Sequence, residues 1–351
     1  MKIKPSTMVG LDIVRKHNSA LKDLGPNLVA VFVGGTSGIG ETTARAFVKH
    51  TLSPRVYLIG RNESQASQII EELRQLNRDS QASFIKCDVS RLHDVDEACK
   101  TIQSKEDKVN LLFMSPGIMT TKGRDGMSAF LEVNPLANPS LETDEGLDKK
   151  LSLHYYARMR FLVNLLPQLT NAGTSNQLSR TISVLSAGHE AKLRLDDLTL
   201  KHNYSLGNCA NHATTMNSLA MEELAASHPA TSFIHAYPGG VNTGLLNNML
   251  GRFGSNALAF LLRPWLVPLD QSGERHLYAA TSSTYPSRDR KADDAVSGSD
   301  GTKGSGAYLL SWDGSVTGNQ KILNGYRSDG TRKTVWEHTL GVFEDVCGRK
   351  E

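Results

Sequence analysis

The sequence lacks any long, uninterrupted hydrophobic run. Its most apolar segment, residues 257–269, contains Arg263, Pro264 and Pro268, whereas a membrane-spanning helix needs about 20 apolar residues in succession. Residues 1–7 have no apolar core of the kind that signal peptides contain. We therefore expect no transmembrane segment and a cytoplasmic location.

The sequence also lacks an excess of one charge and any cluster of cysteines. Its 39 Lys and Arg are interleaved with 36 Asp and Glu, which argues against a nucleic-acid partner. The four cysteines have neither CxxC nor metal-ligand spacing, so we expect reduced thiols and no metal site. They are Cys87, Cys99, Cys209 and Cys347.

Short apolar runs alternate with helical periodicities along the chain. The expected strands are 28–33, 55–60, 82–87, 109–114, 180–185, 231–237 and 307–312. The expected helices are 8–24, 38–50, 62–76, 91–105, 146–170, 208–227 and 334–346. Such alternation predicts an α/β fold, a Rossmann-type doubly wound parallel sheet with helices on both faces.

We expect one domain over residues 1–351. Residues 1–27 form an N-terminal helical extension, 28–245 a dinucleotide-binding core, and 246–351 a substrate lid and C-terminal extension. A Ser/Gly/Asp-rich patch, 287–305, is expected to be a mobile loop.

A glycine-rich turn follows the first expected strand. Gly34, Gly38 and Gly40 are followed by a helical pattern. Glycines let such a turn fold tightly and let phosphates approach the backbone, while the helix N-terminus attracts negative charge. The turn alone also fits a glycine-rich loop without a ligand.

Four further signals stand at later strand ends: Arg61, Cys87-Asp88-Val89, Ser115-Pro116-Gly117 and Pro238-Gly239. In this order, residues 28–245 resemble the short-chain dehydrogenase/reductase family. The resemblance implies a nicotinamide cofactor whose pyrophosphate lies on the glycine turn. Arg61 stands where NAD-preferring members have a carboxylate, which implies NADP(H), because a guanidinium binds a 2′-phosphate at two points. Alternatively, Arg61 is a solvated helix-start residue and Asp88 caps the next helix.

The cofactor contacts implied by the resemblance lie at these strand ends. They are Gly34, Thr36, Ser37, Gly38, Ile39, Gly40, Arg61, Asn62, Asp88, Val89, Ser115, Gly117, Pro238, Gly239, Val241 and Thr243.

The family's catalytic pattern is only partly preserved. Ser186 matches its serine, and His154 aligns with its asparagine. A gapless count places Ser205 at the tyrosine and Cys209 at the lysine, and no Tyr-x3-Lys occurs within 190–225. We therefore predict three catalytic residues: Ser186, the neighbouring Tyr204 as proton donor, and His154 as a proton relay with a pKa near neutrality.

Other side chains near this pattern have weaker claims. His189 and His212 are reserves for the relay, and each histidine could instead be surface-exposed or a satisfied buried residue. Tyr204 could be a loop aromatic that covers the cleft. Tyr155 and Tyr156 are expected to pack rather than react.

An apolar, proline-broken stretch runs from Leu245 to Leu269. As a lid it would suit a lipophilic small-molecule substrate, although a packing or dimer-contact helix has the same pattern, and a homo-oligomer is possible. The chain resembles a divergent branch common among fungal secondary-metabolism reductases, which implies terpenoid or polyketide tailoring.

The expected activity is hydride transfer between NADP(H) and a carbonyl or alcohol, and reduction is favoured because the basic lysine is missing. Two alternatives stay open. One is an isomerase, dehydratase or cyclase that keeps the cofactor site; the other is a cofactor-binding protein without chemistry.

Overall fold

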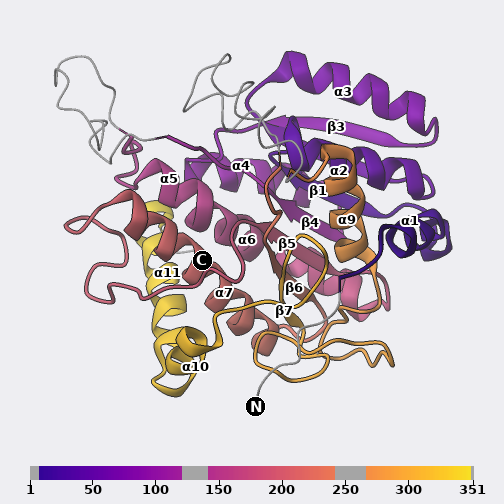
Figure 1. Cartoon of the computed structure of the whole chain (residues 1–351). Helices are drawn as coiled ribbons and strands as arrows, with labels where there is room; N and C mark the ends of the chain where they lie inside the picture. Colours follow the sequence, from indigo (N-terminus) through magenta and orange to yellow (C-terminus); the bar gives the residue numbers. More distant parts are fainter. Residues whose placement is uncertain (1–7, 121–140, 242–265, 349–351) are drawn as a thin grey trace.

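The computed structural model describes residues 8–120, 141–241 and 266–348, and these form one parallel sheet covered by helices (Figure 1). The sheet has seven strands in the order β3-β2-β1-β4-β5-β6-β7. Their bounds are Val29–Val33 (β1), Arg55–Gly60 (β2), Gln81–Lys86 (β3), Leu111–Met114 (β4), Arg180–Val184 (β5), Ser232–Ala236 (β6) and Ala307–Leu310 (β7). The predicted α/β fold with a Rossmann-type sheet is confirmed.

The chain reverses its direction of travel across the sheet after β3, and the switch point lies between β1 and β4. It passes outward to β2 and β3, then returns so that β4 pairs with β1 on the other side, with Ala30 opposite Leu111. Crevices outside the carboxyl ends of strands at such a switch point are where open α/β sheets bind ligands. The fold therefore directs attention to the ends of β1 and β4.

Two helical layers cover the sheet (Figure 1). The helices are Leu11–Ser19 (α1), Gly38–His50 (α2), Glu63–Leu76 (α3), Leu92–Gln103 (α4), Lys149–Leu151 (α5), Ala157–Thr174 (α6), Leu206–Ser227 (α7), Leu269–Thr281 (α9), Gln320–Ser328 (α10) and Thr331–Cys347 (α11). Alternate residues of β1 serve two cores: Val31 faces the core with α4, α6, α7 and α11, and Phe32 faces the core with α1, α2 and α9. This follows from the two-residue period of a strand.

The structure corrects three expectations about helices and loops. The expected helix at 146–170 is interrupted by a π-helical turn, Ser152–Tyr156 (η2), between α5 and α6. Helix α10 was not predicted. The expected mobile loop at 287–305 is irregular but anchored, because Ser299 is fully buried and its N–H donates to the carbonyl of Ala307 at 2.9 Å.

Among the helices of the three described ranges, none combines the length and apolar character needed to cross a bilayer. Tyr155 and Tyr156 pack as predicted. Both are fully buried, and their hydroxyls bond to Thr339 and His338 of α11 at 2.6 and 2.9 Å.

Candidate active site

The glycine turn closes tightly against the end of β4. Gly34 has a φ of +80° and Gly38 a φ of +58°, conformations that favour glycine. A Cβ on Gly34 would lie 3.0 Å from the backbone N of Pro116, and a Cβ on Gly40 would collide with the Gly34 carbonyl and lie 2.7 Å from Oγ of Ser115. Gly34 and Gly40 are thus required by the close approach of main chain to main chain, and Gly38 by its positive φ.

Helix α2 begins at this turn without a side-chain cap. Ser37, at its N-cap position, is exposed and makes no capping hydrogen bond, whereas Asn62 caps α3 and Ser205 caps α7. Uncapped N–H groups at a helix N-terminus are suited to an anionic group such as a pyrophosphate. Thr36 is buried against Gly60, so a ligand here would meet its backbone rather than its side chain.

Charged residues lie at the ends of β2 and β3. The Arg61 side chain is exposed beyond β2. Asp88 accepts hydrogen bonds from Ser90, at 3.1 Å from its N–H and 2.8 Å from its Oγ, and Lys149 lies 3.9 Å away. Burial acts to raise the pKa of Asp88, but the Ser90 hydrogen bonds and the charges of Lys149 and Arg61 outweigh it, so the pKa is lowered. Asp88 therefore stabilises the turn that follows β3, and the first N–H groups of α4 are accepted by Glu145 instead. Val89 is buried in the core.

His154 lies beside the end of β4. Its Nε2 accepts the N–H of Ile118 at 3.2 Å, and a Cβ on Gly117 would lie 3.2 Å from the same atom. Burial, then the charges of Arg158 and Lys150, lower the pKa of His154 to about 3. The expectation of a pKa near neutrality is therefore wrong, and His154 is a neutral hydrogen-bond acceptor at physiological pH.

Ser186 follows β5 and is half-buried. Its backbone N–H donates to Nε2 of the fully buried His235 at 3.1 Å, and the other ring nitrogen of His235 lies 2.9 Å from Oγ of Ser218. The Ser218 hydroxyl in turn donates to Glu190 at 2.8 Å. The sequence did not predict this series of hydrogen bonds behind Ser186, because its residues come from separate parts of the chain.

The two reserve histidines differ in environment. The exposed His189 packs edge-on to Tyr237, with ring centroids 4.9 Å apart. The buried His212 accepts the N–H of Arg194 at 3.0 Å. His212 is thus a satisfied structural residue.

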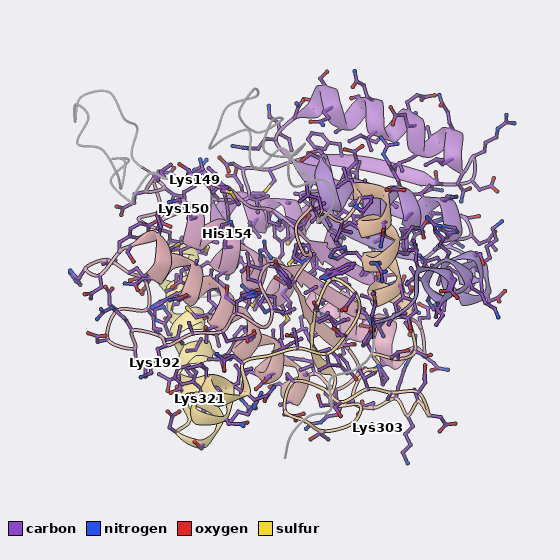
Figure 2. All side chains as sticks on the ribbon, in the orientation of Figure 1. Lys149, Lys150, His154, Lys192, Lys303 and Lys321 are labelled. Atoms are coloured by element: carbon purple, nitrogen blue, oxygen red, sulfur yellow. The ribbon has the colours of Figure 1, made fainter. Side chains whose placement is uncertain are left out.

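Tyr204 meets a lysine from a distant part of the chain. The Nζ of Lys150 donates to the Tyr204 hydroxyl at 3.1 Å, and Lys150 is only 5% exposed. Burial, followed by Cys209 and Asp148, raises the pKa of Tyr204 well above its usual value, and burial lowers the pKa of Lys150. Figure 2 shows Lys150 and His154 near each other around α5 and the following turn.

The residues at the family's tyrosine and lysine positions have structural roles. Ser205 accepts the N–H of Asn208 at 3.0 Å as the cap of α7, and the buried Cys209 Sγ lies 3.7 Å from Oδ1 of Asp148. The Asn208 side chain donates to the carbonyl of Asn203 at 2.7 Å. None of these supplies a cation to Tyr204, whereas Lys150 does.

The substrate side is described only in part. Gly239 has a φ of +73° and packs against Trp312, and Val241 pairs with Val267. Thr243 and the apolar residues 245–265 lie outside the described residues. Leu269 begins α9, which packs on α1 and α2, so this end of the expected lid is part of the core layer.

A separate cavity of about 720 Å³ lies near the N-terminus of α4 and the C-terminal part of α11. Its lining includes Arg91, Glu145 and Val346 but none of the predicted site residues. Glu145 accepts the first N–H groups of α4, at 2.7 and 2.9 Å. This cavity is therefore distinct from the crevice at the glycine turn.

Comparisons with known proteins agree with a nucleotide-binding sheet. The model of the short chain dehydrogenase family matches residues 28–136. "Oxidoreductase AN1596" of Emericella nidulans is 41% identical over 97% of this chain and 100% of its own length. Human "Polyprenol dehydrogenase" is 26% identical over 73% of each chain.

A solved alcohol dehydrogenase of the archaeon Thermococcus sibiricus, complexed with 5-hydroxy-NADP, has the same fold. It is 18% identical, covers 73% of this chain and 90% of its own, and has a TM-score of 0.52. The chain belongs to the short-chain dehydrogenase/reductase family, in a divergent branch with fungal oxidoreductases. It is an oxidoreductase with a Rossmann-type fold.

Proposed function

We propose that this protein is an NADP(H)-dependent reductase of a carbonyl group on a lipophilic small molecule, in a terpenoid or polyketide tailoring step. The hydrogen bond between Lys150 and Tyr204 carries the proposal, because it gives a tyrosine near the crevice the cation that its own helix lacks. We also propose that residues 1–351 act as one unit in this reaction.

The residues around the glycine turn fit a nicotinamide dinucleotide. The uncapped start of α2 would hold the pyrophosphate, and a side chain at Gly34 or Gly40 would disturb the turn that presents it. The exposed Arg61 would bind a 2′-phosphate, and no carboxylate takes its place at the end of β2. When bound, the cofactor supplies the hydride.

Three side chains would then stabilise and protonate the carbonyl oxygen of the substrate. The Ser186 hydroxyl would donate a hydrogen bond to it, and Tyr204 would give up its phenolic proton as negative charge develops on that oxygen. The ammonium of Lys150, already donating to the Tyr204 hydroxyl, would stabilise the phenolate left behind. Nε2 of neutral His154 accepts the Ile118 N–H and so carries no proton to deliver, which makes His154 a positioning residue.

The raised pKa of Tyr204 supports reduction over alcohol oxidation. A phenol that stays protonated at neutral pH can act as a general acid in reduction, whereas oxidation needs a general base at the same place. The lipophilic substrate class is supported by the human relative, which is named for a polyprenol.

A spectrophotometric assay tests the proposal. The purified protein is incubated with NADPH or NADH and a panel of terpenoid and polyketide ketones, aldehydes and alcohols. We expect loss of the reduced-nicotinamide absorbance with NADPH and at least one ketone or aldehyde. A product formed without any change in this absorbance would contradict reduction.

That second outcome would favour the alternative of a non-redox isomerase, dehydratase or cyclase on the same scaffold. The observation behind the alternative is the structural role of Ser205 and Cys209 at the family's tyrosine and lysine positions.

A further inference from the structure

Arg158 of α6 is a buried cation held only by neutral groups. It is 1% exposed. Its Nε donates to the carbonyl of Leu153 at 3.1 Å, and its terminal nitrogens donate to Oγ of Ser183 and the carbonyl of Val184, both at 2.8 Å, and to the carbonyl of Pro116 at 2.6 Å. The guanidinium thus ties together the carboxyl ends of β4 and β5.

This position is directly behind the crevice. Pro116, which accepts from Arg158, is the residue against which Gly34 of the glycine turn packs. Two histidines flank the same region, and the charge of Arg158, after burial, lowers the pKa of both His154 and His235 to about 3. The charge of Arg158 therefore acts on groups at the carboxyl ends of both β4 and β5.

No carboxylate in the described ranges forms an ion pair with Arg158. Burial lowers the pKa of Arg158 to about 9, so the group is still a cation at neutral pH. The flanking histidines are neutral. A buried charge that only dipoles surround acts at longer range than a solvated one.

We propose that Arg158 makes this site discriminate between the two redox states of the nicotinamide, binding the neutral reduced ring more tightly than the cationic oxidised ring. This inference rests on the proposed cofactor function. The physical cause is like-charge repulsion between the buried guanidinium and the oxidised ring. The consequence is a reductase that takes up NADPH readily and releases NADP⁺ readily.

Arg180 provides a matched control. It is also a buried arginine, 4% exposed, and its guanidinium donates to the carbonyls of Ala279, Ser282 and Tyr285 at 2.9, 2.8 and 2.5 Å. However, it lies at the amino end of β5, whereas Arg158 binds the carboxyl end of the same strand. Its charge is therefore remote from the crevice.

The test is a pair of binding titrations, with NADPH and with NADP⁺, on four proteins: wild type, Arg158→Gln, Arg158→Lys and Arg180→Gln. Unfolding transitions first establish that each variant is folded. We expect the wild type to bind NADPH about tenfold more tightly than NADP⁺, a difference of about 1.4 kcal/mol. Arg158→Gln should lose most of this preference, while Arg158→Lys and Arg180→Gln keep it.

Equal affinities in the wild type would overturn the inference, even if no variant folded. It would also fall if folded Arg158→Gln kept the preference, or if Arg158→Lys lost as much of it as Arg158→Gln. A protein that binds neither dinucleotide would instead refute the proposed cofactor function.

Discussion

Lys150 and Tyr204 are 54 positions apart in the chain, and the Nζ of the first lies 3.1 Å from the hydroxyl of the second. The π-helical turn that follows Leu151 and the cap at Ser205 fix the two segments from which they come. A cation that stabilises a phenolate needs only proximity, so it can come from another helix. Proton delivery in the proposed reaction depends on this pair.

The first prediction concerns this pair. Tyr204→Phe removes the proton donor and should slow carbonyl reduction about 100-fold or more. Lys150→Met should slow it about tenfold or more, since the phenolate loses its counter-charge, and Lys150→Arg should recover part of the rate. Steady-state rates with NADPH and a ketone found active in the panel measure all three.

Lys321→Met serves as the control for the lysine variants. Lys321 is exposed on α10 and lies well away from Lys150 in Figure 2. Its rate should equal that of the wild type. An unchanged rate in Tyr204→Phe would remove this tyrosine from the mechanism.

The second prediction concerns cofactor choice. Arg61→Ala should weaken NADPH binding about tenfold while leaving NADH binding unchanged, because only NADPH has the 2′-phosphate. Arg74→Ala is the matched control, since Arg74 is on α3 with a side chain 60% exposed. Titration of both dinucleotides decides the matter. If Arg61→Ala weakened both equally, the 2′-phosphate assignment would be wrong.

The third prediction concerns the turn. Gly40→Ala places a Cβ against the Gly34 carbonyl and Ser115 Oγ, so we expect loss of NADPH binding together with a lower free energy of unfolding. Gly325→Ala, on exposed α10 with nothing within 4 Å of the new Cβ, should instead stabilise the protein by about 0.5–1 kcal/mol. Urea titrations of the two variants test this opposition, which equal effects would refute.

The fourth prediction is a loss of stability in acid. Burial lowers the pKa of His154 and His235 to about 3 and that of His276 to about 4, from 6.5. Their folded-state pKa values are depressed, so their stabilising contribution is present above pH 6.5 and is lost as the pH falls toward these values. Each should cost about 1.4 kcal/mol per pH unit in that window.

Urea unfolding at about pH 7.5, 6 and 5 measures this slope. The variant His276→Gln removes a single titrating ring and should reduce the slope by about 1.4 kcal/mol per pH unit. A free energy of unfolding that does not change between pH 6 and 5 would show that these histidines do not stay neutral in the fold.

The sheet was predictable because each strand is a short apolar run that can be recognised from neighbouring residues alone. Val29–Val33 and Arg55–Gly60 are apolar runs ended by glycine, and both were placed to within a residue. Helix α10 was missed because it is only nine residues long and Leu323 is its sole buried residue. The π-helical turn inserts a backbone irregularity that side-chain periodicity does not report.

The site was predictable only where chemistry is local in sequence. The glycine turn was found from the spacing of Gly34, Gly38 and Gly40, and the structure shows close contacts that a side chain at Gly34 or Gly40 would disturb. Lys150 was missed because a search for a lysine four residues after a tyrosine cannot find one from another helix. His154 kept its predicted place but not its pKa, since burial and the charge of Arg158 are properties of the packed state.

The transfer of deuterium from NADPH labelled at the transferring position of C4 tests the central claim most directly. With a ketone found active in the panel, the account predicts one deuterium on the new carbinol carbon in the wild type. Tyr204→Phe should form this product more slowly but with the same label. A product without deuterium, or one formed while NADPH stays reduced, would contradict hydride transfer by this protein.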